Sequence, residues 1–400
     1  MNILHIFSNW KWTGPAEHAL NLALEHRRLG HDVTFACAAP PEGAPASILG
    51  IARERGIEPY TGCRLSKHFS PAGSLQDVLR LAGFIRQSGF DVVHTHMPND
   101  HLLAGLAVRL GLAKAVLVRT SYDGSGIRAG ARTRLCLRYL TDGFLTIAEA
   151  TGSQIIKRRY LPEHKLWKTD VPVDLERFNP DRVAGCRDKF GLTPEAVVGG
   201  IVARVQTHRR FEVLLEALGI VVREFPGFKF MIIGRGTNIE KIAIKPAQAM
   251  GIRPNLIFTG YMKEDYVETL ACLNFKIFLV PGSDGACRAV REAMAMGKPV
   301  IAARRGMLPE LVEHQQHGLV IDDTAENIAE AILALVEHPD QREAMGRNAR
   351  RKAQERFDSR LQAAGIIRVY EELIARKARP RWYHALTRRP KRTQQPAEDA

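Results

Sequence analysis

The sequence predicts an α/β protein with two parallel sheets, each covered by helices. Short apolar or β-branched runs alternate with longer segments of helical periodicity, an alternation that is typical of parallel sheets. The chain has 400 residues, which exceeds the length of one ordinary core and predicts two domains. The alternation restarts after VPVDLERFNPDRVAG, a stretch rich in Pro and Asp, so we place the domain boundary near residue 180.

Five segments in each half are expected to be strands, because they are short, apolar and separated by helical patterns. In the first half they are residues 2–7, 32–37, 91–96, 115–120 and 143–148. In the second half they are residues 197–205, 228–234, 255–260, 275–280 and 298–303. From about residue 324 the chain is expected to be wholly helical, first packing on the second sheet and then bridging back to the first. Two such sheets face each other across a cleft, so we expect the chemistry in the loops that follow strands.

Composition argues against several protein classes. The chain has no basic start followed by a long apolar region and no uninterrupted run of about 18 apolar residues, so a soluble, cytoplasmic protein is expected. Its six cysteines lack CxxC spacing, which indicates reduced structural thiols rather than a zinc site or a redox motif.

The net charge of +14 is unevenly distributed along the chain. Residues 376–400 hold eight Lys/Arg and two acidic residues with few apolar anchors, so we expect a disordered tail. A solvated tail and contact with an anionic membrane surface are both open interpretations, and Trp382 and Tyr383 suit an interface. Nucleic-acid binding is the least favoured interpretation, because no stacking platform or recognition motif accompanies the charge.

Two loops of the first half carry candidate ligand contacts. Gly14 and Pro15 follow the first strand and open a helical pattern, which allows close backbone approach to a ligand; ordinary turn chemistry is the alternative. His94 and His96 alternate at the end of a strand, so both imidazoles point to one side and only His96 is expected to reach the cleft, as a substrate contact. The alternatives are a structural histidine and a metal ligand shared with His101.

The first strand of the second half is followed by a cluster of arginines. Arg204 ends the strand, and Arg209 and Arg210 open the next helix. Guanidinium groups at this spacing can converge on a pyrophosphate, where they form bidentate hydrogen bonds and neutralise the charge of a leaving group. A solvated basic loop is the alternative.

The stretch GSDGACRAVREAMAMGKPVI predicts a helix that begins near Ala286 and faces an anion. Its charged residues Asp284, Arg288 and Glu292 are spaced to form one line on the helix surface. The helix start offers unpaired backbone N–H groups near Ala286, Cys287 and Arg288, which suit phosphate. Glu292 lies roughly 9 Å along the axis, so the two acids can meet opposite ends of a nucleotide diphosphate. Two surface carboxylates around a capped helix are the alternative.

In these residues the chain resembles the retaining glycosyltransferases of family GT4, which have the GT-B fold of two Rossmann-like domains with parallel sheets facing a central cleft. The resemblance covers roughly residues 1–375, and the last of the segments that carry it is the most specific. These segments are GPAEHALNLALEHRRLGHDV, DVVHTH, VDLERFNP, VARVQTHRRFEVLLEAL and DGACRAVREAMAMGKPVIAARRGMLPELVEHQQHGLVI. The resemblance implies an acceptor-binding domain over residues 1–180, a nucleotide-sugar-binding domain over 181–360, and a helix over 361–375 that bridges back to the first domain, before the tail at 376–400.

The resemblance also implies roles for individual residues. Arg204 and Arg209 match the pair that contacts the diphosphate, with Arg209 in place of a lysine, and His96 matches a histidine near the transferred sugar. Asp284 replaces the first glutamate of the family pattern and completes the implied catalytic set. The implied donor-binding residues are Gly14, Gly260, Tyr261, Met262, Ala286, Cys287, Arg288 and Glu292. Further departures from the family pattern are Pro15 and Met307, which stand where glycine is common.

The implied function is a retaining hexosyltransferase that moves a sugar from a nucleotide diphosphate sugar to a glycan or lipid-linked acceptor. No cofactor or divalent metal is expected, because the arginines supply the positive charge that a metal gives elsewhere. The resemblance suggests a role in lipopolysaccharide or other cell-envelope polysaccharide synthesis. An amphipathic or basic surface on the first domain, together with the basic tail, suggests peripheral attachment to the inner face of the cytoplasmic membrane. The alternatives are a nucleotide-sugar epimerase or hydrolase on the same fold, and a nucleotide-sugar-binding protein without turnover.

Overall fold

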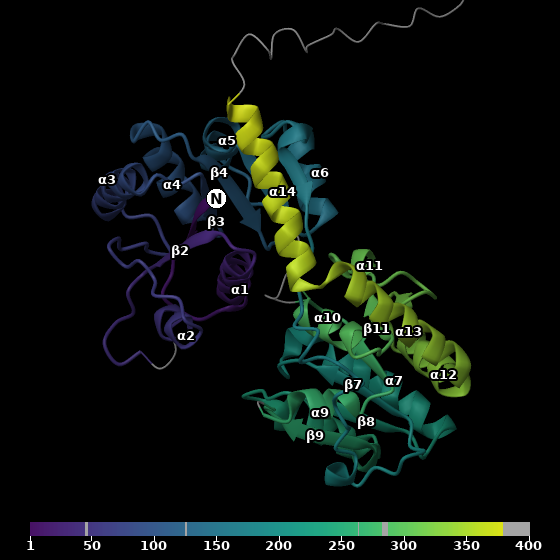
Figure 1. Ribbon diagram of the computed structural model, residues 1–400. Coiled ribbons are helices and arrows are strands. Elements are labelled where there is room, and N and C mark those ends of the chain that lie inside the picture. The colour runs from purple at the N-terminus through teal and green to yellow at the C-terminus, as the bar shows by residue number, and fades with distance from the viewer. Residues whose placement is uncertain (45–46, 125, 263, 282–286, 379–400) are drawn as a thin grey trace, which may run out of the picture.

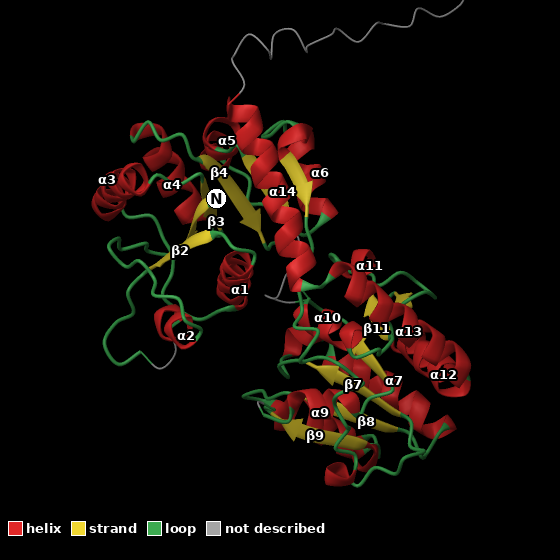
Figure 2. Ribbon diagram, in the orientation of Figure 1, coloured by secondary structure: helices red, strands yellow, loops and turns green. Residues whose placement is uncertain are grey.

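The chain folds into two lobes, each built around one sheet (Figure 1). The computed structural model describes residues 1–44, 47–124, 126–262, 264–281 and 287–378. Figure 2 shows that helices surround the strands of each lobe. Within the described residues, no helix combines the length and the apolar character that crossing a membrane requires.

The sheet of the first lobe has six parallel strands in the order β2-β1-β3-β4-β5-β6. Its strands are β1 (Asn2–Phe7), β2 (Asp32–Cys37), β3 (Val92–Thr95), β4 (Val116–Ser121), β5 (Gly143–Thr146) and β6 (Leu166–Lys168). Its α-helices are α1 (Gly14–Arg28), α2 (Ile48–Glu54), α3 (Pro71–Ser88), α4 (Pro98–Leu110), α5 (Ala131–Leu135) and α6 (Glu149–Lys157), with the π-helical turn η1 (Cys136–Leu140) after α5 and the 3-10 turn η2 (Glu163–Lys165) before β6. The direction of winding reverses between β1 and β3, which creates a crevice at their carboxyl ends.

The second lobe has six parallel strands in the order β12-β11-β10-β7-β8-β9, and its winding reverses between β7 and β10. Its strands are β7 (Val198–Val202), β8 (Lys229–Ile233), β9 (Leu256–Gly260), β10 (Phe275–Phe278), β11 (Val300–Ala303) and β12 (Gly318–Ile321). The helices are α7 (Phe211–Glu224), α8 (Lys245–Ala249), α9 (Tyr266–Ala271), α10 (Arg288–Ala295), α11 (Leu308–Leu311), α12 (Ala325–Glu337) and α13 (Pro339–Arg356). The short turns are η3 (Asp188–Phe190), η4 (Thr207–Arg209), η5 (Glu240–Ile244) and η6 (Arg253–Asn255).

The last helix, α14 (Ser359–Ala378), returns to the first lobe and lies along it (Figure 1). Its buried residues Ile366 and Tyr370 share a core cluster with Ile3 of β1 and Val116 of β4. Burying each large apolar side chain stabilises the fold by about 1.5–3 kcal/mol, so this contact fixes α14 on the first sheet.

The predicted α/β fold with two parallel sheets is confirmed. Two strands, β6 and β12, were not predicted, because each is a short strand at the edge of its sheet with no long apolar run. The predicted helical character of the chain from about residue 324 is also confirmed. The predicted boundary near residue 180 falls in the segment between β6 and β7, and the basic tail after residue 378 lies outside the described residues.

Candidate functional site

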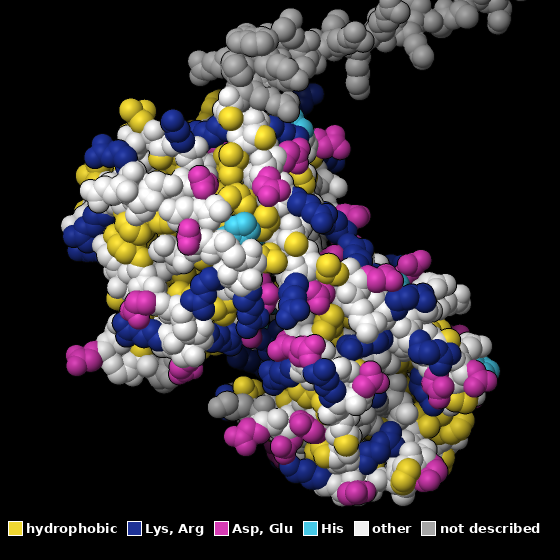
Figure 3. Space-filling view, viewed as in Figure 1, with side chains coloured by type: hydrophobic (Ala, Val, Ile, Leu, Met, Phe, Trp, Pro, Cys, Tyr) yellow, Lys and Arg dark blue, Asp and Glu magenta, His cyan; other side chains and the backbone are white. Residues whose placement is uncertain are grey.

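The two points where the winding reverses bring four loops to the junction of the lobes. The loops after β1 and β3 come from the first lobe, and the loops after β7 and β10 come from the second. Figure 3 shows that Lys and Arg side chains gather where the two lobes meet. The residues that the sequence singled out lie in these loops, in the loop after β9, or on the helices that follow them.

Gly14 is the first residue of α1 and is exposed. The preceding residue, Thr13, makes no side-chain capping hydrogen bond, and Pro15 occupies the first turn. A Cβ atom built on Gly14 has no heavy atom within 4 Å, so this position faces open space. The start of α1 therefore leaves backbone N–H groups and room for a ligand.

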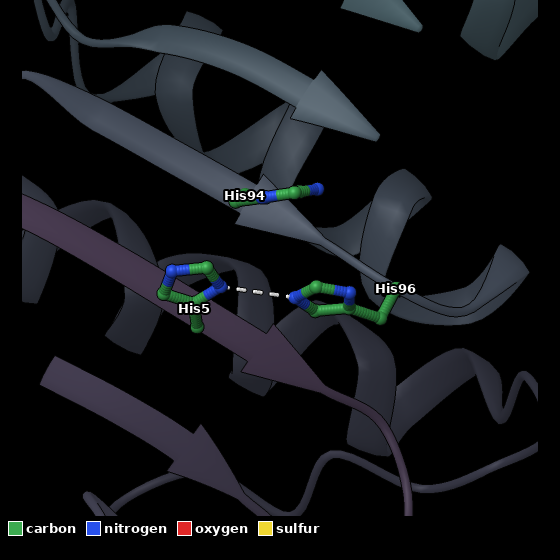
Figure 4. Close-up of side chains that lie close together, drawn as sticks. All are labelled: His5, His94 and His96. Atoms are coloured by element: carbon green, nitrogen blue, oxygen red, sulfur yellow. Dashed lines mark hydrogen bonds between the residues drawn. The ribbon is translucent and has the colours of Figure 1, made fainter. Parts of the chain in front are cut away.

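His96 belongs to a chain of buried imidazoles (Figure 4). Its Nδ1 lies 3.0 Å from the Tyr122 hydroxyl, and its Nε2 lies 3.0 Å from Nδ1 of His5. The chain continues from His5 Nε2 to His26 Nδ1 at 3.1 Å. Burial lowers the pKa of His5 and of His96 well below the ordinary value, and lowers the pKa of His26 to about 3. The imidazoles are therefore neutral at pH 7, and each can donate one hydrogen bond and accept one.

The neighbouring histidines have separate partners. His94 lies 2.7 Å from Thr120 Oγ1 through Nε2, and its Nδ1 contacts the Tyr370 hydroxyl of α14. His101 lies 2.7 Å from Thr141 Oγ1, so the alternative grouping of His96 with His101 at a metal is not formed. Among the described residues, His5, His94 and His96 place ligand nitrogens within 4.8 Å of one another, but hydrogen bonds already engage these rings.

The three arginines after β7 have different surroundings. Arg204 is exposed just beyond the strand, and Arg209 ends η4 with its Nη1 donating to the Val280 carbonyl at 2.5 Å. Val280 follows β10, so Arg209 joins the loops after β7 and β10. Arg210 instead has a φ of +63° and forms an ion pair at 3.1 Å with Asp323, which follows β12.

The helix α10 begins at Arg288, two residues after the predicted start near Ala286. Cys287 precedes the helix with a φ of +48°, a left-handed conformation that a helix interior does not adopt. Cys287 is also fully buried. Asp284 and Ala286, which were predicted to meet the donor, lie outside the described residues.

Glu292 is only 5% exposed, so its predicted place on the helix surface is wrong, whereas the predicted alignment of Arg288 with Glu292 along the helix is confirmed. Its carboxylate accepts a hydrogen bond from the Tyr266 hydroxyl at 2.6 Å and pairs with Arg288 Nε at 3.1 Å. Arg288 Nη1 also pairs with Glu17 of α1 at 2.6 Å. Arg288 thus connects the two lobes instead of pointing freely toward a phosphate.

The loop after β9 presents an aromatic ring. Gly260 has a φ of +71°, and its carbonyl accepts a hydrogen bond from the Gly234 N–H at 2.9 Å. Tyr261 is 65% exposed, and the Arg235 guanidinium lies 4.9 Å from its ring centroid. Met262 is half-buried against the core. An exposed ring of this kind can stack on another planar group, and the donor-binding role implied for Gly260, Tyr261 and Met262 remains a prediction.

Three side chains of the junction were not predicted. Tyr122 and Tyr266 bind His96 and Glu292 respectively, and His5 supports His96 from the adjacent strand. His5 lies opposite His94 in the register of β1 and β3, which the sequence alone does not specify. The position of Tyr122, just beyond the end of a strand, was a usable signal, because functional residues of parallel sheets follow strand ends.

Known protein families match both halves of the chain. Residues 12–177 match the sequence profile described as Glycosyltransferase Family 4, and residues 187–352 match the profile described as Glycosyl transferases group 1.

Characterised relatives and a solved structure agree with these matches. The chain is 30% identical over 276 residues to a GDP-mannose-dependent alpha-(1-6)-phosphatidylinositol monomannoside mannosyltransferase of Mycobacterium tuberculosis, covering 64% of this chain and 70% of that protein. It is 27% identical over 324 residues to a D-inositol 3-phosphate glycosyltransferase of Saccharomonospora viridis, covering 74% of each. The structure of Anabaena HepE in complex with UDP superposes with a TM-score of 0.76 at 17% identity, covering 93% of this chain and 100% of that one. This last similarity supports the fold.

Proposed function

Because the chain belongs to the family 4 glycosyltransferases, which have the two-domain GT-B fold, we propose that it transfers a sugar from a nucleotide diphosphate sugar to a glycan or lipid-linked acceptor. The observation that carries this proposal is the meeting of the loops after β7 and β10 at Arg209. Arg204 follows the carboxyl end of β7, and Arg288 pairs with the Glu292 carboxylate on α10, the helix that follows the loop after β10. This combination suits a diphosphate together with a ribose.

In the proposed reaction the anomeric carbon keeps its configuration. The bond from this carbon to the leaving phosphate oxygen breaks, a bond to the acceptor oxygen forms on the same face, and the acceptor proton passes to the leaving oxygen. Arg204 and Arg209 stabilise the negative charge on the diphosphate, so we propose that turnover needs no divalent metal. His96 is neutral, and its two ring nitrogens already bond Tyr122 and His5, so it holds the sugar by exchanging one of these hydrogen bonds rather than by delivering charge.

The test of this proposal replaces Arg209. Arg209→Ala is expected to lower kcat/KM by about 100-fold or more, because one charge-stabilising donor is lost. Arg209→Lys is the matched control, since it keeps the charge and should retain most activity. Turnover of Arg209→Ala at the wild-type rate would overturn the role of this residue, and loss of turnover in EDTA would overturn metal independence.

Product analysis separates the alternatives. UDP- and GDP-sugars are incubated with the enzyme, with and without acceptor, after a thermal-shift screen has identified the donor that raises the melting temperature. A transferase forms a glycosylated acceptor, whereas a hydrolase or an epimerase changes the donor alone. Donor binding without any of these products would instead support a non-catalytic binding protein.

We further propose that the acceptor belongs to the cell envelope, as a polysaccharide or lipopolysaccharide precursor, and is met at the inner face of the cytoplasmic membrane. A relative whose name specifies a phosphatidylinositol-based acceptor supports a lipid substrate. Support also comes from α5 and η1, which expose Leu135 and Tyr139 beside Arg134 and Arg138. Apolar and cationic side chains together suit an anionic membrane surface. Sedimentation with anionic but not neutral liposomes is expected, and no sedimentation with either would refute membrane attachment.

A further inference from the structure

A cavity of about 810 Å³ opens between the lobes, mainly on the first-lobe side. The first lobe supplies most of its wall, including Pro15 and His96, and the second lobe supplies Pro281, Gly306 and Met307. The cavity therefore reaches from the acceptor half to the second lobe. Its wall does not include Arg204, Arg209 or Glu292, so it is separate from the proposed diphosphate contacts.

The wall of this cavity carries an excess of positive charge. Four of its side chains are cationic, whereas Asp123 is the acidic residue among its described lining residues. The cations are Lys67, Arg119, Arg128 and Arg132. None of these four forms an ion pair within 4 Å with any part of the chain that the structure describes. Like charges gathered around one cavity repel one another, and a bound anion removes that repulsion.

Arg119 is the deepest of these cations. It extends from β4, and burial lowers its pKa from the ordinary value. Its Nε is out of contact with water and has no hydrogen-bond partner, and its Nη1 lies 3.5 Å from His101 Nδ1. Because Nε is out of contact with water, a ligand in the cavity meets the Nη groups of Arg119, and these donors suit a ligand that supplies oxygen atoms.

Among the described residues, the buried carboxylate of Asp100 acts on Arg119 through its charge but forms no hydrogen bond or ion pair with it. Asp100 accepts hydrogen bonds from the backbone N–H groups of Ser8 and Met97, at 3.0 Å and 2.8 Å, and so is held by the loops after β1 and β3. Burial raises the pKa of Asp100 to about 7, so its negative charge is only partly present at neutral pH. The positive charge of Arg119 therefore remains available to the cavity.

The rest of the wall is suited to a carbon framework. Apolar side chains line it beside the cations, and Phe69 is 49% exposed with the Arg132 guanidinium 5.4 Å from its ring centroid. The apolar lining residues include Phe69, Met97, Pro98, Ile127, Leu137 and Phe144. Arg132 also donates to Asn99 Oδ1 at 2.8 Å, which holds its guanidinium at the wall.

We propose that this cavity binds the acceptor through a phosphate ester, with Arg119 at its deep end and Arg128 and Arg132 nearer the surface. Guanidinium groups form bidentate hydrogen bonds with phosphate oxygens, which explains why arginine predominates here. The inference rests on the proposed function, because it names the class of acceptor for the same transfer. Both a free polyol phosphate and a lipid phosphodiester contain a phosphate ester.

The experiment measures binding of matched probes by calorimetry. The wild-type enzyme is titrated with inositol 3-phosphate, inositol and inorganic phosphate. Inositol 3-phosphate is expected to bind at least tenfold more tightly than inositol, and Arg119→Met to remove this preference, with partial rescue by Arg119→Lys. Arg132→Gln is a second variant at the exposed end of the cavity, and should weaken phosphate binding about threefold to tenfold. Arg86→Gln, on the exposed face of α3, is the control and should bind as the wild type does.

A sedimentation assay distinguishes the two sources of phosphate. If the wild type but not Arg119→Met binds vesicles that contain phosphatidylinositol, and neither binds phosphatidylcholine vesicles, the ligand is the lipid. If inositol 3-phosphate binds in calorimetry but the protein binds no vesicles, the ligand is the free phosphate. The proposal would be overturned if the wild type bound inositol, inositol 3-phosphate and inorganic phosphate with equal affinity and bound both kinds of vesicle equally.

Measuring the affinity for UDP and GDP tests the proposed function independently of this inference. Arg119→Met is expected to bind these nucleotides within about twofold of the wild-type affinity. An equal loss of nucleotide and phosphate binding would overturn the proposal, because the cavity would then belong to the donor. If the wild type binds neither nucleotide, the proposed function fails, while the Arg119 series still decides whether the cavity recognises phosphate.

Discussion

At the scale of single residues, His5 shows how a buried polar side chain becomes part of a functional site without touching a ligand. It accepts and donates hydrogen bonds within the chain that ends at His96 and Tyr122. Neutral imidazoles linked in this way fix one another's ring orientation and tautomer. The orientation of His96 therefore depends on residues of β1 and α1 as well as on its own strand.

Replacing His5 tests this dependence. His5→Leu leaves nitrogens of His96 and His26 buried without partners, so the free energy of unfolding is expected to fall by about 2–4 kcal/mol. Urea denaturation at pH 7.5 measures the change. His5→Gln, which retains a donor and an acceptor, is expected to lose less. A His5→Leu variant as stable as the wild type would show that these nitrogens need no partner.

At the scale of elements, α10 and α1 are connected across the junction by Arg288. Its guanidinium is shared between Glu17 of α1 and Glu292 of α10. The side chains of Glu17 and Arg288 are 27% and 46% exposed, so the pair stabilises the protein by no more than about 1 kcal/mol. Its importance lies in position, because it holds a cation next to the loop that follows β10.

Glu17→Gln is expected to strengthen nucleotide binding. The substitution removes a negative charge from the junction and frees Arg288 from one carboxylate, so the affinity for UDP or GDP should rise about twofold to fivefold. Calorimetric titration measures the affinity. Glu58→Gln, at an exposed ion pair with Arg53 on the first lobe, is the matched control and should leave it unchanged. Weaker binding by Glu17→Gln would indicate that the ion pair instead holds the lobes in the binding arrangement.

At the scale of the whole molecule, six buried histidines make stability depend on pH. Burial lowers the pKa of each below its ordinary value, and to about 3 for His18 and His26. The others are His5, His94, His96 and His101. Below pH 6.5 the unfolded chain takes up protons on these histidines whereas the folded chain does not. The free energy of unfolding therefore falls as the pH falls from 6.5 toward 3.

The free energy of unfolding is expected to fall steeply as the pH falls. Each histidine contributes about 1.4 kcal/mol per pH unit once the pH is well below 6.5, so the six together approach the total stability of a typical domain within one or two units. Asp100 acts in the opposite direction, because its raised pKa of about 7 makes the folded state take up a proton first. We expect acid unfolding near about pH 5.

Urea denaturation between pH 7.5 and 5 measures this dependence. His18→Gln should reduce the slope of stability against pH by about one histidine's share, and His68→Gln, at an exposed position, is the control that should leave it unchanged. A free energy of unfolding that stays constant from pH 7 to pH 5 would contradict the argument.

The sequence by itself determined the parallel sheets and most of their strands. Alternation of apolar runs with helical patterns is a local signal, and β1 and β2 have the predicted bounds because each is a short apolar segment between polar turns. The same local rule placed Gly14, His96 and Arg209 in loops or helix starts beyond strand ends. The edge strands β6 and β12 were not predicted, because three or four residues are too few to show a hydrophobic periodicity.

The tertiary structure alone decided which of these residues meet. The register of β1 against β3 sets His5 beside His94, and residues more than 270 positions apart form the pairs of Arg288 with Glu17 and of Tyr370 with His94. No local pattern specifies such contacts, because they follow from how two separately patterned lobes and a returning helix pack. Burial of Glu292 arises in the same way, because helical spacing predicts a face whereas the neighbouring elements decide whether that face is covered.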